Sequence, residues 1–122
     1  MCGIAGIYNA KGIDLVEVNT LSQTLKHRGP DDEGFFLSNN EHFSENCREN
    51  DTISELQQLK HISEVTSNPS LALVHRRLSI IDLSALGHQP LVSADKRFVM
   101  VYNGEVYNFK EIRQELEQKG YV

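Results

Sequence analysis

Three strand-like segments follow one another in this 122-residue chain without a helix between them. These three strands are expected at 34–37, 70–83 and 97–102. A further strand is expected at 3–8, and helices are expected at 15–26 and 108–120. Parallel neighbours need a long connection that is usually helical, whereas antiparallel neighbours do not. The order strand, helix, three strands, helix therefore predicts an α+β fold, with an antiparallel sheet and helices on its outer faces.

Both expected helices have recognisable ends. Apolar residues recur on one helical face from Leu15 to Lys26, and the following Gly29-Pro30 pair forbids continuation. In the second helix, Asn108 is a candidate N-cap with Glu111 three residues later, and Gly120 closes the helix.

The stretch from Ser38 to Asn68 differs in kind. It is rich in Asn, Glu and Ser and has only a weak helical period. We interpret residues 39–68 as a surface insertion, part loop and part short helix, with local disorder as an open alternative. The insertion contains Cys47, which we interpret as a free thiol without a task.

Composition excludes several classes of protein. A hydrophobic fraction of 39% and a charged fraction of 24% are typical of one soluble globular domain. The net charge of -5, without a basic cluster larger than a pair, argues against nucleic acid or an anionic membrane as partner. No segment approaches the roughly 18 apolar residues of a membrane span, and the opening lacks the basic n-region of a secretory signal.

The cysteines and histidines predict neither a disulfide framework nor a metal site. The two cysteines are far apart without CxxC spacing, and the five histidines lack the spacing of metal ligands. Free cysteines favour a reducing compartment, so a cytoplasmic location is expected.

Cys2 is the first candidate for chemistry, because loss of Met1 would make it the amino terminus. The residue would then carry a thiol together with a free α-amine. That amine, with a reference pKa of about 7.7–8.0, could act as the base of the thiol. The alternative is an incidental cysteine near a chain end.

Asn103, Gly104 and Glu105 form the second candidate, between an expected strand and an expected helix. An Asn amide and a Gly backbone N–H at a bend can converge on one oxygen, as in an oxyanion hole. Taken alone, however, Asn-Gly is also the commonest hairpin-turn signal. Both interpretations stay open from these residues.

Arg76 and Arg77 form the third candidate. A guanidinium binds a carboxylate through a two-pronged fork that fixes its orientation. Side chains alternate along a strand, so at most one of the two arginines can face a given buried site. The alternative is a solvated pair, and HRGPDD at 27–32 is interpreted as a structural corner.

The chain carries five motifs in the order MCGIAGIY, HRGPDDEG, HRRLSIIDL, GHQPL and NGEVYNF. Together they resemble the glutamine amidotransferase domain of asparagine synthetases, a class II amidotransferase. The resemblance covers the chain outside 39–68, and HRGPDD with RLSIIDL points to the asparagine-synthetase branch. It implies an N-terminal-nucleophile hydrolase fold, an αββα sandwich of antiparallel sheets.

The resemblance also implies roles for particular residues. Cys2 would attack the side-chain amide of L-glutamine, releasing ammonia and leaving a glutamyl thioester, while Asn103 and Gly104 hold the oxyanion. Arg77 would bind the substrate α-carboxylate and Glu105 its α-amino group. The pocket would be lined by the backbone of Leu78, Ser79, Ile80 and Ile81.

Two family features have no counterpart before Val122: an Asp that also binds the glutamine amino group, and an SGG-type pyrophosphate loop. Residues 1–122 are therefore expected to be a partial domain, incomplete at its C-terminus. The chain itself is expected to need no cofactor, whereas ATP and Mg²⁺ belong to a separate synthetase domain that amidates a carboxylate, aspartate by default.

An incomplete sandwich leaves an unpaired strand edge and an uncovered apolar face. We therefore expect low stability or self-association into a homo-oligomer. A monomer with a sharp cooperative melt in sedimentation and calorimetry would contradict this expectation.

Two other functions stay open from the sequence. The chain could be an inactive remnant that binds a partner subunit, or a different N-terminal-nucleophile hydrolase. HRGPDD and RLSIID argue against the second, and measured glutamine binding would argue against the first.

Overall fold

A computed structural model describes residues 1–39, 42–80 and 84–121 of the chain. Short 3-10 turns occur at Ser54–Leu56, Ile62–Glu64 and Ala85–Gly87. The helices and strands are β1 (Gly3–Tyr8), α1 (Leu15–Leu25), β2 (Asp32–Ser38), β3 (Ser44–Arg48), β4 (Lys60–His61), β5 (Leu71–Arg77), β6 (Leu91–Val92), β7 (Val99–Met100) and α2 (Phe109–Gln118).

The main sheet has five strands in the order β1-β5-β2-β3-β4. All neighbours are antiparallel except β3 and β4. β5 lies between β1 and β2, with Gly3 opposite Arg76 on one side and Asp32 opposite Arg77 on the other. The beginning of the chain and the end of β5 therefore lie side by side.

The core lies between this sheet and α1. Asp14 caps the helix by accepting a hydrogen bond from the Val16 N–H at 2.9 Å, as expected for a short polar N-cap. Val18 of α1 packs with Phe35 and Val74 in the buried cluster. Alternate residues of β2 and β5 supply the sheet side of the core, because side chains of a strand point to opposite faces in turn.

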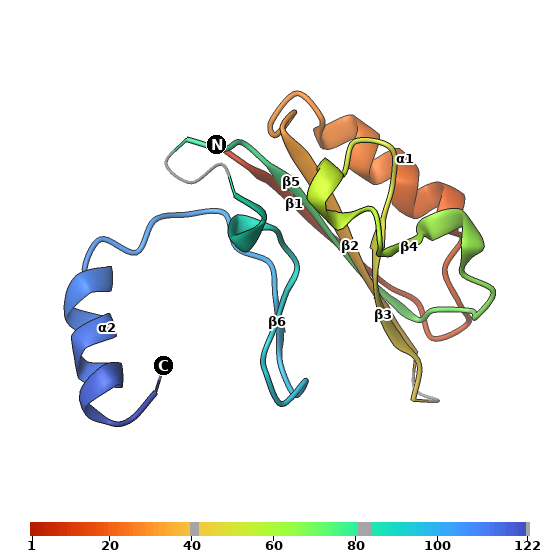
Figure 1. Cartoon of the computed structure of the whole chain (residues 1–122). Coiled ribbons are helices and arrows are strands. Elements are labelled where there is room, and N and C mark those ends of the chain that lie inside the picture. Colours follow the sequence, from red (N-terminus) through yellow and green to blue (C-terminus); the bar gives the residue numbers. More distant parts are fainter. Residues whose placement is uncertain (40–41, 81–83, 122) are drawn as a thin grey trace.

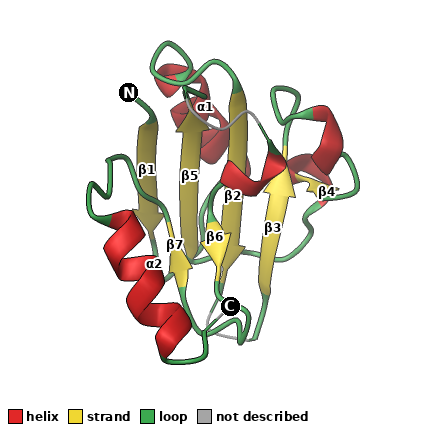
Figure 2. Cartoon of the chain, turned by 60° about the vertical axis from the view of Figure 1, so that its left-hand side comes forward, coloured by secondary structure: helices red, strands yellow, loops and turns green. Residues whose placement is uncertain are grey.

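The second sheet is a short antiparallel pair of β6 and β7. Figures 1 and 2 show this hairpin and α2 on the side of the main sheet opposite α1. The structure confirms a mixed α+β fold with two sheets and two helices. The αββα sandwich stays a prediction.

The surface placement of 39–68 was wrong. Within this stretch, β3 pairs with β2, and Cys47, Ile62 and Val65 belong to the buried core. Burial raises the pKa of the Cys47 thiol to about 12, with the nearby Glu45 adding to the effect. Cys47 is the one buried residue of β3 and its neighbours in the strand are polar, so no apolar pattern marks the strand in the sequence.

Two expected strands were also misjudged. β5 ends at Arg77 instead of continuing to residue 83, and residues 81–83 lie outside the described part. The expected central strand at 97–102 is reduced to Val99–Met100, which pairs only with β6. Its apolar residues look like a buried strand in sequence, yet Phe98 and Met100 are more than half exposed.

The final helix forms where it was predicted but ends at Gln118, and Gly120 follows its C-cap with a φ of 84° that suits glycine. Asn108 occupies the N-cap position but its side chain makes no capping hydrogen bond. α2 contributes no buried residue, and Ile112 and Leu116 are about two-fifths exposed. Only α1 covers a sheet face as expected, and among the described residues no helix is long and apolar enough to cross a membrane.

Buried charges tie α1, β2 and β5 together. The fully buried guanidinium of Arg76 lies 2.7 Å from the carboxylate of Glu33 and 2.8 Å from that of Asp51. Arg76 Nε donates to the backbone and hydroxyl oxygens of Ser22 at 3.1 and 2.8 Å. These contacts lie on the side of the main sheet that α1 covers.

Candidate active site

A cavity of about 410 Å³ lies beside the end of β5. The residues proposed from sequence gather in it, although they come from three distant segments. Ile81 lies outside the described residues. The predicted residues that line the cavity are Cys2, Arg77, Leu78, Ser79, Ile80, Asn103, Gly104 and Glu105.

Strand pairing places Cys2 in this cavity. Gly3 pairs with Arg76, so the preceding residue, Cys2, is carried to the end of β5. Its Sγ accepts a hydrogen bond from the Leu78 N–H at 3.3 Å. The partly buried thiol is therefore held by backbone at the cavity wall. Met1 lines the same cavity, and its peptide bond occupies the Cys2 α-nitrogen.

Arg76 and Arg77 point to opposite faces, as strand alternation requires. Arg76 lies beneath α1, whereas Arg77 lines the cavity and is only 7% exposed. The Nη1 group of Arg77 donates to the Ser84 carbonyl at 2.7 Å. The interpretation as a solvated arginine pair was therefore wrong: both side chains are buried.

The Asn103-Gly104 segment is not the turn of the second hairpin. That turn lies between β6 and β7, where Ser93 N–H donates to Phe98 O at 2.9 Å. Asn103 and Gly104 follow β7 and line the cavity. A Cβ on Gly104 would lie 2.6 Å from the Tyr102 hydroxyl, so glycine lets this segment fold tightly over the tyrosine ring.

A family model described as "Glutamine amidotransferase domain" matches residues 1–49 and 44–122. This chain belongs to the glutamine amidotransferase domain family. Its relatives include a putative glutamine-hydrolyzing asparagine synthetase 2 of Methanocaldococcus jannaschii, 35% identical over 93% of this chain and 20% of the relative. Glutamine-hydrolyzing asparagine synthetases of Bacillus subtilis and Escherichia coli are 34% and 33% identical, over 100% and 94% of this chain.

This amidotransferase domain chain spans only a small part of those relatives, 15% of the Bacillus and 16% of the Escherichia protein. No solved structure matches it. Residues of four of the five family motifs line one cavity, and HRGPDDEG at 27–34 is the motif that contributes no lining residue.

The HRGPDD loop of this amidotransferase domain supports the cavity wall through hydrogen bonds. Asp31 accepts from the Ser79 N–H at 2.7 Å. Asp32 accepts from the Ile53 N–H at 3.1 Å, and its other oxygen lies 2.7 Å from His88 Nδ1. A Cβ on Gly29 would lie 2.4 Å from the Arg76 backbone, so glycine allows the loop to pack directly on β5. These contacts are those of a structural corner.

His75 is a cavity residue that the sequence reasoning missed. It is 1% exposed and lines the cavity, and its Nε2 has no hydrogen-bond partner among the described residues. Its position in β5, two residues before Arg77, could have revealed it, because i and i+2 share a strand face. His75 and Tyr102 line the same cavity, so β5 and the segment carrying Asn103 meet there.

Acid is expected to destabilise the fold through His75. Burial lowers the pKa of His75 to about 4, against a smaller opposing effect of its hydrogen bond to the Tyr102 backbone. Between an unfolded pKa of about 6.5 and this folded value, only the unfolded chain binds the proton, so stability falls as pH falls. The loss from pH 7 to 4 is about 3 kcal/mol for this group.

Urea unfolding of the wild type and His75→Gln between pH 7 and pH 4 measures this contribution. The stability of the wild type is expected to fall more steeply with acid than that of the variant. The two proteins differ only at residue 75. Contributions from other groups, such as Glu33, Asp51, Asp32, His88 and Arg77, therefore largely cancel in the comparison. Parallel pH profiles would contradict the assignment.

Gly87 makes room for the Arg77 guanidinium. A Cβ at Gly87 would lie 2.1 Å from Arg77 Nη2, so Gly87→Ala must displace the flexible end of Arg77. If Arg77 binds glutamine, the KM for glutamine is expected to rise about tenfold or more, because small misplacements of a binding group are costly. The free energy of unfolding should change by less than about 1 kcal/mol.

Steady-state glutamate release and urea unfolding would measure both effects. Gly6→Ala is the matched control, because its Cβ would make only an ordinary 3.4 Å contact with Leu73, away from the cavity. An unchanged KM in Gly87→Ala would exclude an effect of the guanidinium position on glutamine binding.

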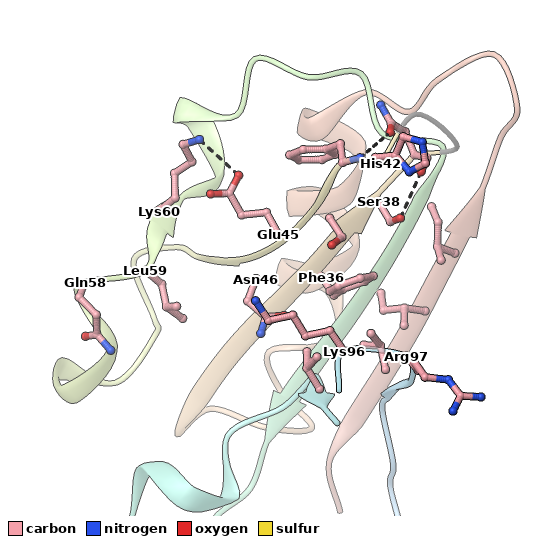
Figure 3. A pocket seen from close by; sticks show the side chains of 17 residues that line it. Phe36, Ser38, His42, Glu45, Asn46, Gln58, Leu59, Lys60, Lys96 and Arg97 are labelled. Atoms are coloured by element: carbon pink, nitrogen blue, oxygen red, sulfur yellow. Dashed lines mark hydrogen bonds and ion pairs between the residues drawn. The ribbon is translucent and has the colours of Figure 1, made fainter. Parts of the chain in front are cut away.

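A second hollow of about 930 Å³ is shown in Figure 3. It lies on the same face of the main sheet as the cavity that contains Cys2, because Leu71 and Leu73 of β5 share a strand face with His75 and Arg77. Phe36, Leu71 and Leu73 line it together with Lys60, which is held by Glu45 at 3.3 Å. None of the residues predicted from the family motifs lines this hollow. Among the described residues, no group of three or more His, Cys, Asp or Glu side chains could hold a metal ion.

Proposed function

We propose that this chain hydrolyses L-glutamine, with Cys2 as the nucleophile. The observation that carries the proposal is the meeting of Cys2, Arg77 and Asn103-Gly104-Glu105 around one cavity. The chain belongs to the glutamine amidotransferase domain family. A thiol, a guanidinium and converging amide donors are the groups that hydrolysis of an amino-acid side-chain amide needs.

The reaction begins after Met1 is removed, which frees the Cys2 α-amine beside the thiol. The amine takes the thiol proton, and Sγ attacks the side-chain amide carbon of glutamine to form a tetrahedral intermediate. The C–N bond then breaks, the protonated α-amine returns its proton to the leaving nitrogen, and ammonia departs. Water, deprotonated by the same amine, hydrolyses the γ-glutamyl thioester to glutamate and restores the thiol.

Other cavity residues bind the substrate and stabilise the intermediate. The Asn103 side-chain amide and the Gly104 N–H donate to the oxyanion, and losing one such donor typically costs about 2.7–4 kcal/mol of barrier stabilisation. Arg77 forms a two-pronged ion pair with the α-carboxylate, and Glu105 accepts from the α-amino group. The backbone of residues 78–80 lines the remaining wall, with Leu78 holding the Cys2 sulfur before Met1 is removed.

The ammonia is used by a synthetase domain, in the same polypeptide or in a partner. This part of the proposal is supported by the relatives, which are named as glutamine-hydrolyzing asparagine synthetases. That domain would use ATP and Mg²⁺ to activate a carboxylate, aspartate by default, for attack by ammonia. A cytoplasmic location suits the free thiol that the reaction needs.

The test combines intact-mass measurement with an assay of glutamate release from L-glutamine. Active protein is expected to lack Met1 and to release glutamate and ammonia in equal amounts. Full activity in protein that retains Met1 would overturn the proposed mechanism. Absence of glutamate release from protein that lacks Met1 would overturn the proposed function and favour a non-catalytic, partner-binding role.

A further inference from the structure

Gln89 connects the cavity segment that carries Asn103 and Gly104 to the main sheet. Its side-chain Oε1 accepts from the Tyr102 N–H at 2.6 Å, and its Nε2 donates to the Tyr102 carbonyl at 3.2 Å. The amide therefore bonds both backbone groups of one residue, as a neighbouring strand would. Tyr102 directly precedes Asn103.

The segment that Gln89 holds has no strand partner in the structure. β7 ends at Met100, and residues 101–105 belong to no strand or helix. Backbone groups outside regular structure need other partners to be fixed in place. Among the described residues, the Gln89 side chain hydrogen-bonds both the N–H and the carbonyl of Tyr102.

Gln89 is itself anchored to rigid parts of the fold. The preceding residue, His88, lies 2.7 Å from the buried carboxylate of Asp32 in β2. A Cβ on Gly34 would lie 2.1 Å from the Gln89 carbonyl oxygen, so glycine in β2 lets the Gln89 backbone rest directly on the sheet. The chain of contacts runs from β2 through Gln89 to Tyr102 and then to Asn103-Gly104.

We infer that Gln89 is a positioning residue, whose amide sets the place of Asn103 and Gly104 relative to Cys2. The inference rests on the proposed function, because the oxyanion donors matter only if Cys2 attacks an amide. Cys2 and Gln89 are far apart in the sequence but line the same cavity. Without the Gln89 amide, Asn103 and Gly104 are no longer fixed at hydrogen-bonding distance from the oxyanion, and the oxyanion is stabilised less.

Hydrogen exchange of the Tyr102 amide tests the contact directly, in the full chain and without any need for activity. Gln89→Met keeps the length of the side chain and removes both hydrogen bonds, so the Tyr102 amide is expected to exchange at least about tenfold faster. Gln89→Glu keeps the acceptor oxygen and should retain most of the protection. The exchange of the Val74 amide in β5 should stay unchanged and reports that the core is folded.

A double-mutant cycle tests how Gln89 acts. Gln89→Met is expected to lower kcat/KM for glutamate release about 10–100-fold. Because Gln89 acts through Asn103-Gly104, adding Gln89→Met to Asn103→Ala should reduce the rate much less than it does in the wild type. Gln114→Met in the exposed helix α2 is the control and should change neither rate nor exchange.

The outcomes separate this inference from the proposed function. Unchanged Tyr102 exchange in Gln89→Met, or full additivity with Asn103→Ala, would overturn the positioning role while glutaminase activity persists. Rapid exchange of the Tyr102 amide, together with a decrease in kcat/KM that is absent in the Asn103→Ala background, would support the positioning role. A wild type without glutaminase activity would overturn the proposed function and the catalytic meaning of the contact, and the exchange result would still decide whether the contact holds Tyr102.

Discussion

Cys2→Ala is expected to lower the rate of glutamate release at least about 10³-fold, because it removes the nucleophile of the proposed reaction. Alanine leaves no atom to form the thioester, and the oxyanion donors alone cannot replace a covalent route. The fold should be preserved. Cys2 precedes β1, and its side chain makes only partly buried hydrogen bonds, with the N–H and carbonyl of Leu78, among the described residues.

Cys47→Ala is the matched cysteine control. The Cys47 thiol lies in the core, where burial raises its pKa to about 12, so little thiolate forms at neutral pH. Activity should be retained, with a loss of stability of about 1–2 kcal/mol from the small cavity. Iodoacetamide should modify Cys2 and leave Cys47 unmodified in the folded protein. Unchanged glutamate release in Cys2→Ala would exclude Cys2 as nucleophile.

Arg76→Leu is expected to cost about 3–5 kcal/mol of unfolding free energy, the usual loss when one partner of a buried ion pair is removed. Arg76 and Glu33 are both fully buried, so the substitution leaves the Glu33 carboxylate without its cation. The substitution also removes the donors to Ser22. Since small domains are stable by only about 5–15 kcal/mol, a large share of the folded population is at risk.

Arg97→Leu provides the control for loss of an arginine charge. Arg97 is 73% exposed and its distance to Asp95 is 3.8 Å, so its removal should change stability by less than about 1 kcal/mol. Urea unfolding followed by circular dichroism measures both variants. Equal losses in Arg76→Leu and Arg97→Leu would show that the buried network does not stabilise the fold.

A second substitution identifies the cause of the loss. Burial raises the pKa of Glu33 even with Arg76 present, because desolvation outweighs the hydrogen bond from Ser22 and the attraction of the guanidinium. Adding Glu33→Gln to Arg76→Leu removes the unpaired charge and should restore at least about half of the lost stability. No restoration would assign the loss to packing rather than to the orphaned carboxylate.

Part of the fold could be predicted from local patterns alone. β1, α1 and α2 form at the expected residues because the apolar spacing and the end signals are local properties. The 39–68 stretch and the 97–102 segment failed for opposite reasons. β3 buries Cys47 among polar neighbours, whereas the apolar residues around β7 find only the short β6 as a partner.

More of the cavity residues than of the strand boundaries could be named from the sequence, because the cavity residues occur in motifs. Cys2, Arg77 and Asn103-Gly104-Glu105 were named from the sequence, and they line one cavity in the structure. His75 and Gln89 were not named. Both line the cavity with Tyr102, and Gln89 hydrogen-bonds its backbone, an arrangement that depends on how β5 and the loop before β6 meet.

The sequence by itself determined that Arg76 and Arg77 face opposite sides of a strand, since the side-chain period of a strand is two. It also determined that Cys2 would become the first residue after loss of Met1. Alternation alone did not say which arginine shares a cavity with Cys2; the family resemblance named Arg77, and the tertiary structure gives the reason: α1 covers the face of Arg76, and Arg77 lies on the face of the cavity that Cys2 lines. The physical reason is that alternation is a property of neighbouring residues, whereas the burial of a face depends on which distant segment packs against it.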